Sequence, residues 1–337
     1  MTTPVPPRPP RRRRRVVLLA AGVVAAIALV AAVVIAVWPQ ADATAQPPGP
    51  GTVVVASDLS KASHAAGTAS AGSEPQAAAE YLSEQPTAFW LTPEADPADE
   101  VAERVEHLAA EARDQSATLA IVVYGLPGRD CGNHSAGGLE PDAYREWTAE
   151  IGAALRAASD VRTVVVLEPD SLALAPECGN VDERVDQLRG AIDALSADGV
   201  WIYLDAGHSS WLAVDDMAAL IARVADGAPV RGFATNVSNY NDTADETRYA
   251  HQLAERLDGL HAIIDTSRNG AGSDGEWCNP QGRRVGDPGG STGDDVVDTN
   301  LWIKPPGESD GPCNGGPAAG AWWSESAVEL TRDVRSG

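Results

Sequence analysis

Short apolar, β-branched runs recur along the chain, and segments with helical spacing separate most of them. Helical patterns cover residues 98–115, 144–158, 181–198, 217–226 and 244–257. Strands that alternate with helices predict a parallel sheet, and about seven repeats within one domain favour an α/β barrel over an open sheet. The predicted strands are Thr87–Leu91, Ala120–Tyr124, Thr163–Leu167, Val200–Leu204, Arg231–Ala234, Ala262–Ile264 and Leu301–Ile303.

Polar residues follow almost every predicted strand. In parallel barrels the active site lies at the C-terminal ends of the strands. A single Asp in this place is often only a helix N-cap. Several polar positions at one edge nevertheless indicate a functional site. Those positions are Asp130, Asp170, Asp205, Asn236, Asp265 and Asp310.

The composition excludes some functions for that site and favours others. The formal net charge is −23, so the chain is a poor ligand for nucleic acids, whose phosphates bind basic patches. Nine Trp against two Phe suggest flat stacking surfaces as well as core packing. Glycoside hydrolysis uses one carboxyl to protonate the leaving oxygen and a second to activate water or attack the sugar. Neighbouring carboxylates raise the pKa of the proton donor, and Trp faces stack on sugar rings.

The N-terminal residues predict export. Arg11 to Arg15 precede an apolar run over 16–38, which is long enough to span a bilayer of about 30 Å. Ala43 to Ala45 form a candidate signal-peptide cleavage site. We expect a basic cytoplasmic tip (1–15), a transmembrane or signal segment (16–38), an Ala/Pro/Ser/Gly-rich linker (39–75) and a catalytic domain (76–337). The length of the run favours a single-pass anchor with the domain on the extracellular face over a secreted protein.

All four cysteines lie in the part expected to be exported, where disulfides persist. Four cysteines allow three pairings. The sequential pairing, Cys131 with Cys178 and Cys278 with Cys313, would close two local loops and stabilise the fold by about 2–4 kcal/mol for each. No C-x-x-C spacing exists, so neither a metal site nor a cofactor is expected.

The strand-end segments resemble glycoside hydrolase family six, the inverting cellulases. The resemblance covers about residues 85–325, with the motifs in family order, and it implies a distorted seven-stranded parallel β/α barrel. The segments are VVYGLPGRDCGNHSAGG (122–138), VVVLEPDSLA (164–173), WIYLDAGHSSWL (201–212), RGFATNVSNY (231–240), AIIDTSRNG (262–270), EWCNPQGR (276–283) and LWIKPPGESDG (301–311).

The resemblance implies catalytic roles. Asp170 matches the family's general acid. Asp130 matches the second carboxylate, which raises the pKa of the acid and helps to deprotonate the attacking water, and Asp310 matches the carboxylate proposed as the base. Asp205 matches an Asp that orients its neighbours. Tyr124 matches the Tyr beneath the distorted sugar, and Arg129 is expected to pair with the acid cluster.

The resemblance also implies sugar contacts. Stacking is expected from Trp90, Trp211 and Trp277, and hydrogen bonds from His208, Asn236, Lys304 and Glu308. Lys304 is the only Lys within residues 76–337. The family often carries a second hydroxyl after the RDC motif, where this chain has Ser135 followed by Ala136, so Ser135 is the candidate replacement. The family pairs its cysteines sequentially.

In the family that the chain resembles, processive members use long loops between these cysteines to roof a tunnel. The segments between Cys131 and Cys178 and between Cys278 and Cys313 lack long insertions, so the resemblance implies an open cleft and cleavage within the polymer. We expect a monomeric endo-β-1,4-glucanase whose partner is β-1,4-glucan, with the membrane contacted only by the N-terminal segment. The alternatives are an exo-acting cellobiohydrolase, a catalytically inactive β-glucan-binding protein and a metal-dependent barrel hydrolase. The last is disfavoured because only His208 lies near Asp205.

Overall fold

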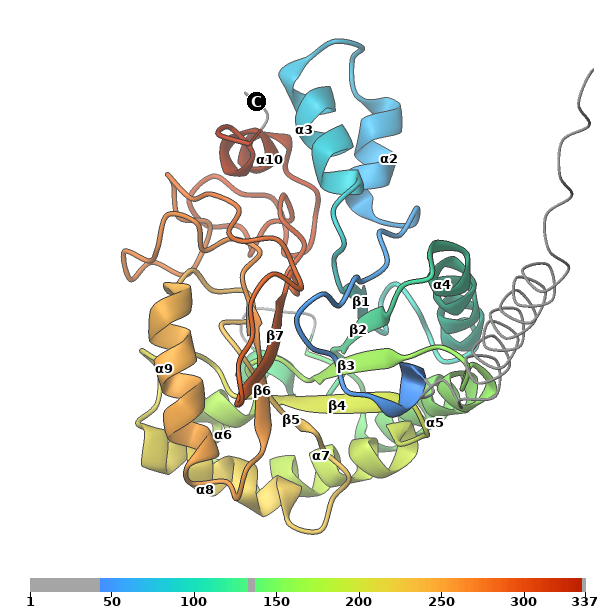
Figure 1. Ribbon diagram of the computed structural model, residues 1–337, viewed down its shortest axis with the longest axis vertical. Coiled ribbons are helices and arrows are strands. Elements are labelled where there is room, and N and C mark those ends of the chain that lie inside the picture. Colours follow the sequence, from blue (N-terminus) through green and yellow to red (C-terminus); the bar gives the residue numbers. More distant parts are fainter. Residues whose placement is uncertain (1–42, 133–136, 335–337) are drawn as a thin grey trace, which may run out of the picture. The chain divides into compact units, whose positions relative to one another are not determined.

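The computed structural model describes residues 43–132 and 137–334 (Figure 1). The chain divides into two units, Met1–Ala43 and Thr44–Gly337, and the description concerns the second. The expected basic tip, the apolar run over 16–38 and Ser135 lie outside the described residues. Within residues 43–132 and 137–334, no helix is both long and apolar enough to cross a membrane.

Seven parallel strands form one sheet in which each strand pairs with the next along the chain. The registers place Val123 opposite Leu167 and Leu167 opposite Leu204, so neighbouring strands end level with one another. The residues that follow these strands therefore meet at one edge. The strands are β1 (Phe89–Leu91), β2 (Leu119–Val123), β3 (Thr163–Leu167), β4 (Val200–Asp205), β5 (Gly232–Thr235), β6 (His261–Asp265) and β7 (Val297–Leu301).

The sheet curls into a half-barrel, which confirms the parallel α/β architecture but not a closed barrel. No pairing joins β1 to β7 in the part of the chain that the structure describes. The region of β1 approaches the residues that follow β7. There, the Ala88 N–H donates to the Trp302 carbonyl (2.9 Å) and the Trp90 indole N–H donates to the Ile303 carbonyl (2.8 Å).

The last strand lies earlier in the chain than the predicted Leu301–Ile303. It spans Val297–Leu301 and contains buried Asp298, Thr299 and Asn300, whose polarity hides the strand in the sequence. Asp298 is compensated by Arg231, at 2.6 and 2.8 Å, and by the Tyr203 hydroxyl, at 2.6 Å. Buried polar groups are tolerated when they are hydrogen-bonded in this way.

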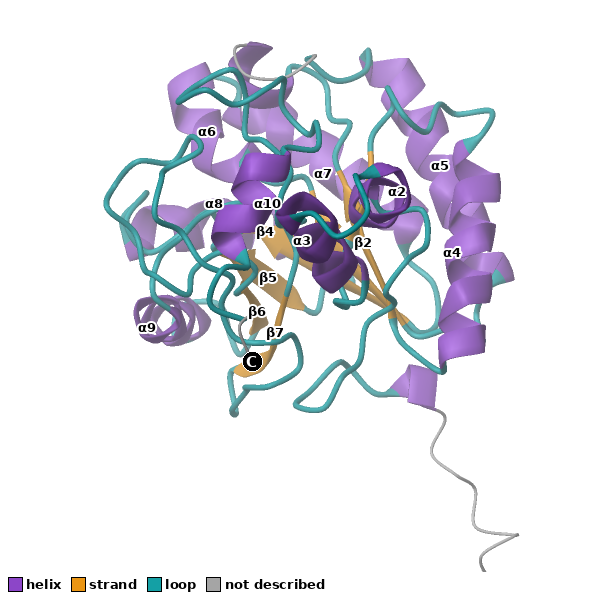
Figure 2. Cartoon of the chain, turned by 90° about the horizontal axis from the view of Figure 1, so that it is seen from above, coloured by secondary structure: helices purple, strands orange, loops and turns teal. Residues whose placement is uncertain are grey.

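Five helices bury their apolar faces against the outer surface of the sheet, as the sequence predicts (Figures 1 and 2). Their bounds differ from the predicted ones by a few residues. The short helix α6 (Ser171–Cys178) follows β3. Two 3₁₀ turns, η1 (Ala43–Ala45) and η2 (Arg129–Gly132), lie before β1 and after β2, respectively. The five are α4 (Val101–Gln115), α5 (Pro141–Ala157), α7 (Val181–Leu195), α8 (Val214–Ala225) and α9 (Thr243–Ala254).

The linker expected over residues 39–75 is wrong for most of its length. Helices α2 (Lys61–Thr68) and α3 (Glu74–Ser83) pack with α10 (Ser324–Leu330) in a second apolar cluster (Figure 2). The segment resembles a linker because it is rich in Ala, Ser and Gly. However, Ala is also the strongest helix former, and a Ser side chain caps each of the two helices. The folded domain therefore begins well before residue 76.

Two disulfides confirm the sequential pairing. Cys131–Cys178 ties the segment after β2 to the end of α6. Cys278–Cys313 closes the segment that contains β7. Both bonds thus brace loops at the C-terminal edge of the sheet.

Candidate active site

A cavity of about 1040 Å³ opens at this edge of the sheet. Its walls also include residues from α2, from the end of α3 and from the segment before α10. Most of the residues predicted for the site line it. They are Trp90, Tyr124, Arg129, Asp130, Asp170, His208, Trp211, Trp277, Lys304, Glu308 and Asp310.

Asp170 directly precedes α6 in a left-handed backbone conformation, with φ of 68°. Its backbone N–H donates to Asp205 Oδ1 (2.9 Å), and Asp205 is almost fully buried behind it. Burial raises the pKa of Asp170 well above its usual range, and the negative charges of Asp205 and Asp130 raise it further. Burial also raises the pKa of Asp205, to about 7. Asp170 is thus set up to hold a proton near neutral pH.

Tyr124, Arg129 and Asp130 form a compact group after β2. The Tyr124 hydroxyl donates to Asp130 Oδ2 (2.7 Å), and the Arg129 guanidinium lies 4.3 Å from the centre of the Tyr124 ring. Arg129 donates to the Tyr124 carbonyl (2.6 Å) and forms an ion pair with Glu94 (2.8 Å), a residue that the sequence analysis did not single out. These contacts fix the phenol beside the carboxylate.

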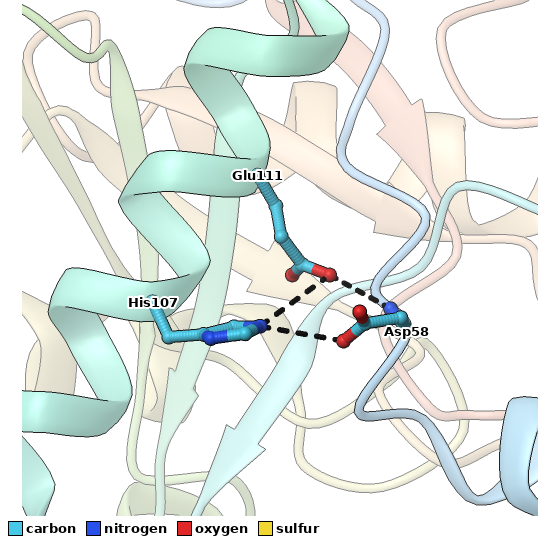
Figure 3. Close-up of side chains that lie close together, drawn as sticks. All are labelled: Asp58, His107 and Glu111. Atoms are coloured by element: carbon cyan, nitrogen blue, oxygen red, sulfur yellow. Dashed lines mark hydrogen bonds and ion pairs between the residues drawn. The ribbon is translucent and has the colours of Figure 1, made fainter.

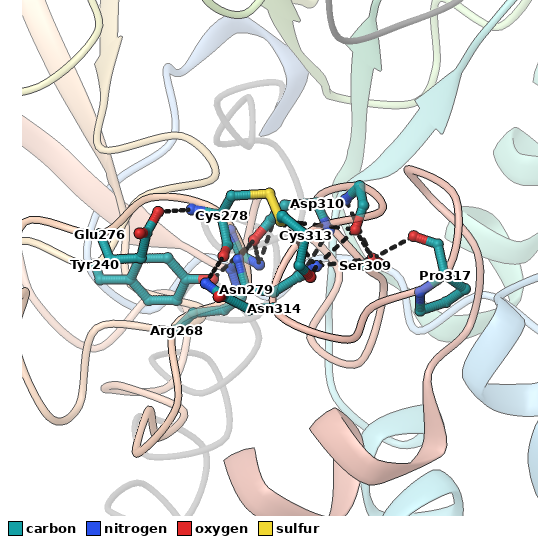
Figure 4. Close-up of a disulfide and its surroundings, with 11 residues drawn as sticks. Tyr240, Arg268, Glu276, Cys278, Asn279, Ser309, Asp310, Cys313, Asn314 and Pro317 are labelled. Carbon is teal, nitrogen blue, oxygen red and sulfur yellow. Dashed lines mark hydrogen bonds and ion pairs between the residues drawn. A yellow bond between two sulfur atoms is a disulfide. The ribbon is translucent and has the colours of Figure 1, made fainter.

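Asp310 lies beside the second disulfide (Figure 4). Arg268 Nη1 contacts both of its carboxylate oxygens, at 2.9 and 3.1 Å. The Tyr240 hydroxyl and the Asn279 N–H each donate to Oδ2 at 3.0 Å. The side chains of Arg268 and Asp310 are 3% and 6% exposed, so this is a buried ion pair. The sequence shows Arg268 after β6, within a segment already rich in strand-end polar residues.

Aromatic rings line the cavity as predicted. Trp90 packs edge-on against Tyr124, with ring centres 5.3 Å apart, and Lys304 Nζ lies 5.2 Å from the Trp90 ring centre. Burial lowers the pKa of Lys304. Trp211 lies near the His208 ring, and Trp277 is 49% exposed.

His208 is held by its neighbours in one orientation. The Asn241 side-chain amide and the Ser210 N–H both approach His208 Nδ1, at 2.9 and 3.2 Å, so Nδ1 is the acceptor nitrogen. Burial lowers the pKa of His208 to about 4. The ring is therefore neutral near pH 6 and can donate through Nε2.

Two predicted site residues, Asn236 and Asp205, lie outside the cavity lining, and a Lys from outside the expected domain joins it. Asn236 does not line the cavity, because it is fully buried and its amide donates to the Asn241 and Asp265 carbonyls. Asp205 also lies behind the wall rather than in it. Lys304 is not the only Lys of the domain, since Lys61 from α2 lines the cavity and forms an ion pair with Glu308 (3.1 Å). No motif in the sequence indicates Lys61, which lies in the expected linker.

Among the described residues, two groups of side chains have the chemistry of metal ligands, and both lie outside the cavity lining. In one, His107 and Glu111 lie one turn apart on α4, and His107 Nε2 is 3.3 Å from Asp58 Oδ1 (Figure 3). The second comprises His251, Asp294 and Asp295. Hydrogen bonds account for the first arrangement, because Glu111 also accepts from the Asp58 N–H (2.8 Å).

The sequence matches Glycosyl hydrolases family 6 over residues 51–334. The chain belongs to this family. It is 42% identical to Endoglucanase A of Cellulomonas fimi over 76% of its own length and 56% of that protein. It is 36% identical to a probable exoglucanase, GH6D, of Podospora anserina over 67% of its own length and 62% of that protein.

A solved structure gives the same assignment. The endoglucanase Cel6 of Mycobacterium tuberculosis superimposes with a TM-score of 0.78 at 35% identity, over 87% of this chain and 99% of that one. It was solved in complex with methyl-cellobiosyl-4-deoxy-4-thio-β-D-cellobioside. The family thus contains endo-acting and exo-acting relatives of this chain. The chain spans little more than half the length of the Cellulomonas protein.

Proposed function

We propose that this family 6 chain hydrolyses internal β-1,4-glucosidic bonds of cellulose or a soluble β-glucan, with inversion at the anomeric carbon. The observation that carries the proposal is the placement of Asp170. This buried carboxyl has a raised pKa, lies beside Asp130 and Asp205, and faces a large cavity lined with Trp rings. A proton donor within a sugar-sized, aromatic cleft is what glycoside hydrolysis requires.

In the proposed reaction, Asp170 gives its proton to the glycosidic oxygen as the bond to the leaving sugar breaks. Asp130 accepts the proton of the attacking water, directly or through a second water, and Tyr124 holds the Asp130 carboxylate in place (2.7 Å). Asp205 keeps the backbone of Asp170 in position and keeps its carboxyl protonated. The Asp310 carboxylate is already paired with Arg268, so its proposed role is to stabilise charge in the site rather than to accept a proton.

The sugar chain is expected to lie along the aromatic side chains. Trp90, Trp211 and Trp277 supply stacking faces, and His208 Nε2 and Lys304 supply hydrogen-bond donors to hydroxyl groups. Glu308 is engaged by Lys61, and this pair would present both charges to the substrate at once. Ser135 remains a proposed contact of the attacking water.

Two observations support endo rather than exo action. The disulfide-bounded segments after β2 and around β7 span only 47 and 35 residues, which leaves little chain to roof a tunnel. The relatives named endoglucanase in Cellulomonas fimi and Mycobacterium tuberculosis are also well aligned with this chain. We therefore propose an open cleft that accepts the middle of a polymer.

Product analysis on a panel of β-glucans tests the activity. We expect the viscosity of a soluble cellulose derivative to fall rapidly while few reducing ends appear. Slow viscosity loss with steady release of cellobiose would instead establish the exo-acting alternative. Binding of oligosaccharides without any turnover would establish the inactive binding protein. NMR of the first product should show the α-anomer, and an initial β-anomer would contradict inversion.

A further inference from the structure

The loop that connects β2 to Asp130 is held from beneath by the buried side chains of Glu168 and Arg184. Glu168 follows β3, and its carboxylate accepts from the Gly125 N–H (3.0 and 3.1 Å) and the Leu126 N–H (3.2 Å). Arg184 comes from α7 and donates to the Pro127 carbonyl (2.9 Å) and the Gly128 carbonyl (3.3 Å). The two side chains thus form hydrogen bonds with the backbone of four consecutive residues, 125–128, with acceptors facing the N–H groups and donors facing the carbonyls.

This loop has little freedom elsewhere. A Cβ atom on Gly125 would lie 2.6 Å from the Trp147 ring, so the backbone there is pressed against α5. Asp130 and Cys131 follow in left-handed conformations, with φ of 55° and 51°, and Cys131 is bonded to Cys178. Non-glycine residues hold such conformations when the surrounding structure determines them. The loop is therefore held in one conformation, and that conformation determines the position of the Asp130 carboxylate.

Glu168 and Arg184 are 1% and 2% exposed, and neither lines the large cavity. They therefore cannot touch a substrate bound there. Glu168 also accepts from the Tyr144 hydroxyl (2.9 Å) of α5, and the charges that act on it include those of Arg129 and Arg184. Burying two charges costs folding free energy unless hydrogen bonds compensate it, and here most of the compensating groups belong to the loop.

We propose that Glu168 and Arg184 are positioning residues, which hold residues 125–128 so that the Tyr124 hydroxyl and the Asp130 carboxylate meet in the geometry needed to activate water. This inference rests on the role proposed for Asp130. Glu168 supplies the acceptors for the first half of the loop and Arg184 the donors for the second half. Loss of either shifts Asp130 without removing any group that contacts the sugar.

Glu168→Gln tests the inference with almost no change of shape. Both Glu168 oxygens accept from backbone N–H groups, so the amide nitrogen of Gln must face at least one donor. We expect kcat on a cello-oligosaccharide to fall about 10- to 100-fold, with KM within about 3-fold of wild type. Tyr144→Phe is the matched control, because it removes a hydrogen bond to the same carboxylate but none to the loop. It should leave kcat within about 3-fold.

A double-mutant cycle with Asp130→Asn separates positioning from simple destabilisation. If Glu168 acts through Asp130, adding Glu168→Gln to Asp130→Asn should lower kcat by less than about 3-fold more. Independent, multiplicative losses would overturn the positioning role, as would equal kcat losses in Glu168→Gln and Tyr144→Phe. If Glu168→Gln does not fold, Arg184→Lys enters the same cycle, because Lys keeps the charge but lacks the two separate nitrogens with which Arg184 reaches the two carbonyls.

The cycle also distinguishes failure of this inference from failure of the proposed function. Asp130→Asn alone should reduce kcat strongly. An unchanged kcat in that single variant would overturn the role of Asp130 and the positioning role with it. A strong loss in Asp130→Asn combined with a multiplicative effect of Glu168→Gln would overturn the positioning role alone.

Discussion

The two carboxylates that could assist the attacking water, Asp130 and Asp310, lie in contrasting surroundings. Asp310 receives hydrogen bonds from a buried Arg, a Tyr hydroxyl and a backbone N–H (Figure 4). Within the described residues, the Asp130 side chain accepts its hydrogen bond from Tyr124 alone. A carboxylate has about four acceptor positions, so the contacts of Asp310 occupy most of them, whereas the described residues leave acceptor positions of Asp130 open to the cavity.

A carboxylate can therefore line the cavity without being free to take a proton from water, because its other hydrogen bonds decide whether it can do so. Both residues line the same cavity and both follow strands in similar sequence settings. Only the partners supplied by distant segments distinguish them. We therefore propose that Asp310 fixes the local charge and that Asp130 exchanges a proton with water.

Substitution of Asp170, the proposed proton donor, should cost the most activity. Asp170→Asn cannot donate a proton, and we expect kcat on cellotetraose to fall about 10²–10⁴-fold, the usual contribution of general acid catalysis. Isothermal titration should still show oligosaccharide binding. A substrate whose leaving group is a stable phenolate should lose much less activity, because it needs no protonation. Equal losses on both substrates would contradict the assignment.

The direct test of the comparison is the matched pair Asp130→Asn and Asp310→Asn. Asp130→Asn should lower kcat at least about 10²-fold and leave the unfolding midpoint in urea nearly unchanged. Asp310→Asn leaves Arg268 buried without its countercharge, and we expect the free energy of unfolding to fall by about 3–5 kcal/mol. The reverse pattern, with kcat lost mainly in Asp310→Asn while the fold stays stable, would make Asp310 the base.

Each of the two carboxylates lies near one disulfide, so removal of either disulfide should perturb the nearby carboxylate less than direct substitution does. Replacing Cys131 and Cys178 with Ser, or Cys278 and Cys313 with Ser, should lower the free energy of unfolding by about 2–5 kcal/mol in each case. The first pair of substitutions should also reduce kcat of the folded protein, because Cys131 directly follows Asp130. Urea unfolding and initial rates at low temperature separate the two effects. A larger kcat loss for the second pair would contradict the greater importance of the Asp130 side.

The last prediction concerns how the stability of the fold depends on pH. Burial raises the pKa of Asp205 from 3.8 to about 7, so the folded state binds a proton more tightly than the unfolded state. The free energy of unfolding should therefore fall as pH rises from about 4 to about 7. Asp205→Asn should flatten this slope in urea unfolding between pH 4 and 8. The exposed Asp216→Asn is the control, and a slope that Asp205→Asn leaves unchanged would refute the explanation.

Much of the fold could be predicted from the sequence, because alternating apolar runs and helical spacing are local signals. Thr163–Leu167 matched its strand at both ends. The final strand was placed too late because its core positions are polar and are satisfied by partners far along the chain, such as Arg231.

The sequence predicts which residues follow the strands, but it does not predict which of their side chains face the cavity. Asp170 and Asn236 each follow a strand closely, yet Asp170 faces the cavity and Asn236 bonds the backbone behind it. Both residues have a left-handed backbone, with φ of 68° and 65°, so the partners around each side chain set its direction, and the residue types do not specify those partners. Arg268 and Lys61 were not assigned because their roles come from contacts with Asp310 and Glu308, which are remote in sequence.

The contact between Lys61 and Glu308 has a practical consequence for protein engineering. An enzyme trimmed to start at residue 76, where the composition suggests a domain boundary, would lose α2 and begin inside α3. It would expose the apolar residues of α10 and remove one wall of the cavity. A fusion partner, affinity tag or immobilisation anchor should therefore be joined ahead of Thr44, where the compact unit begins.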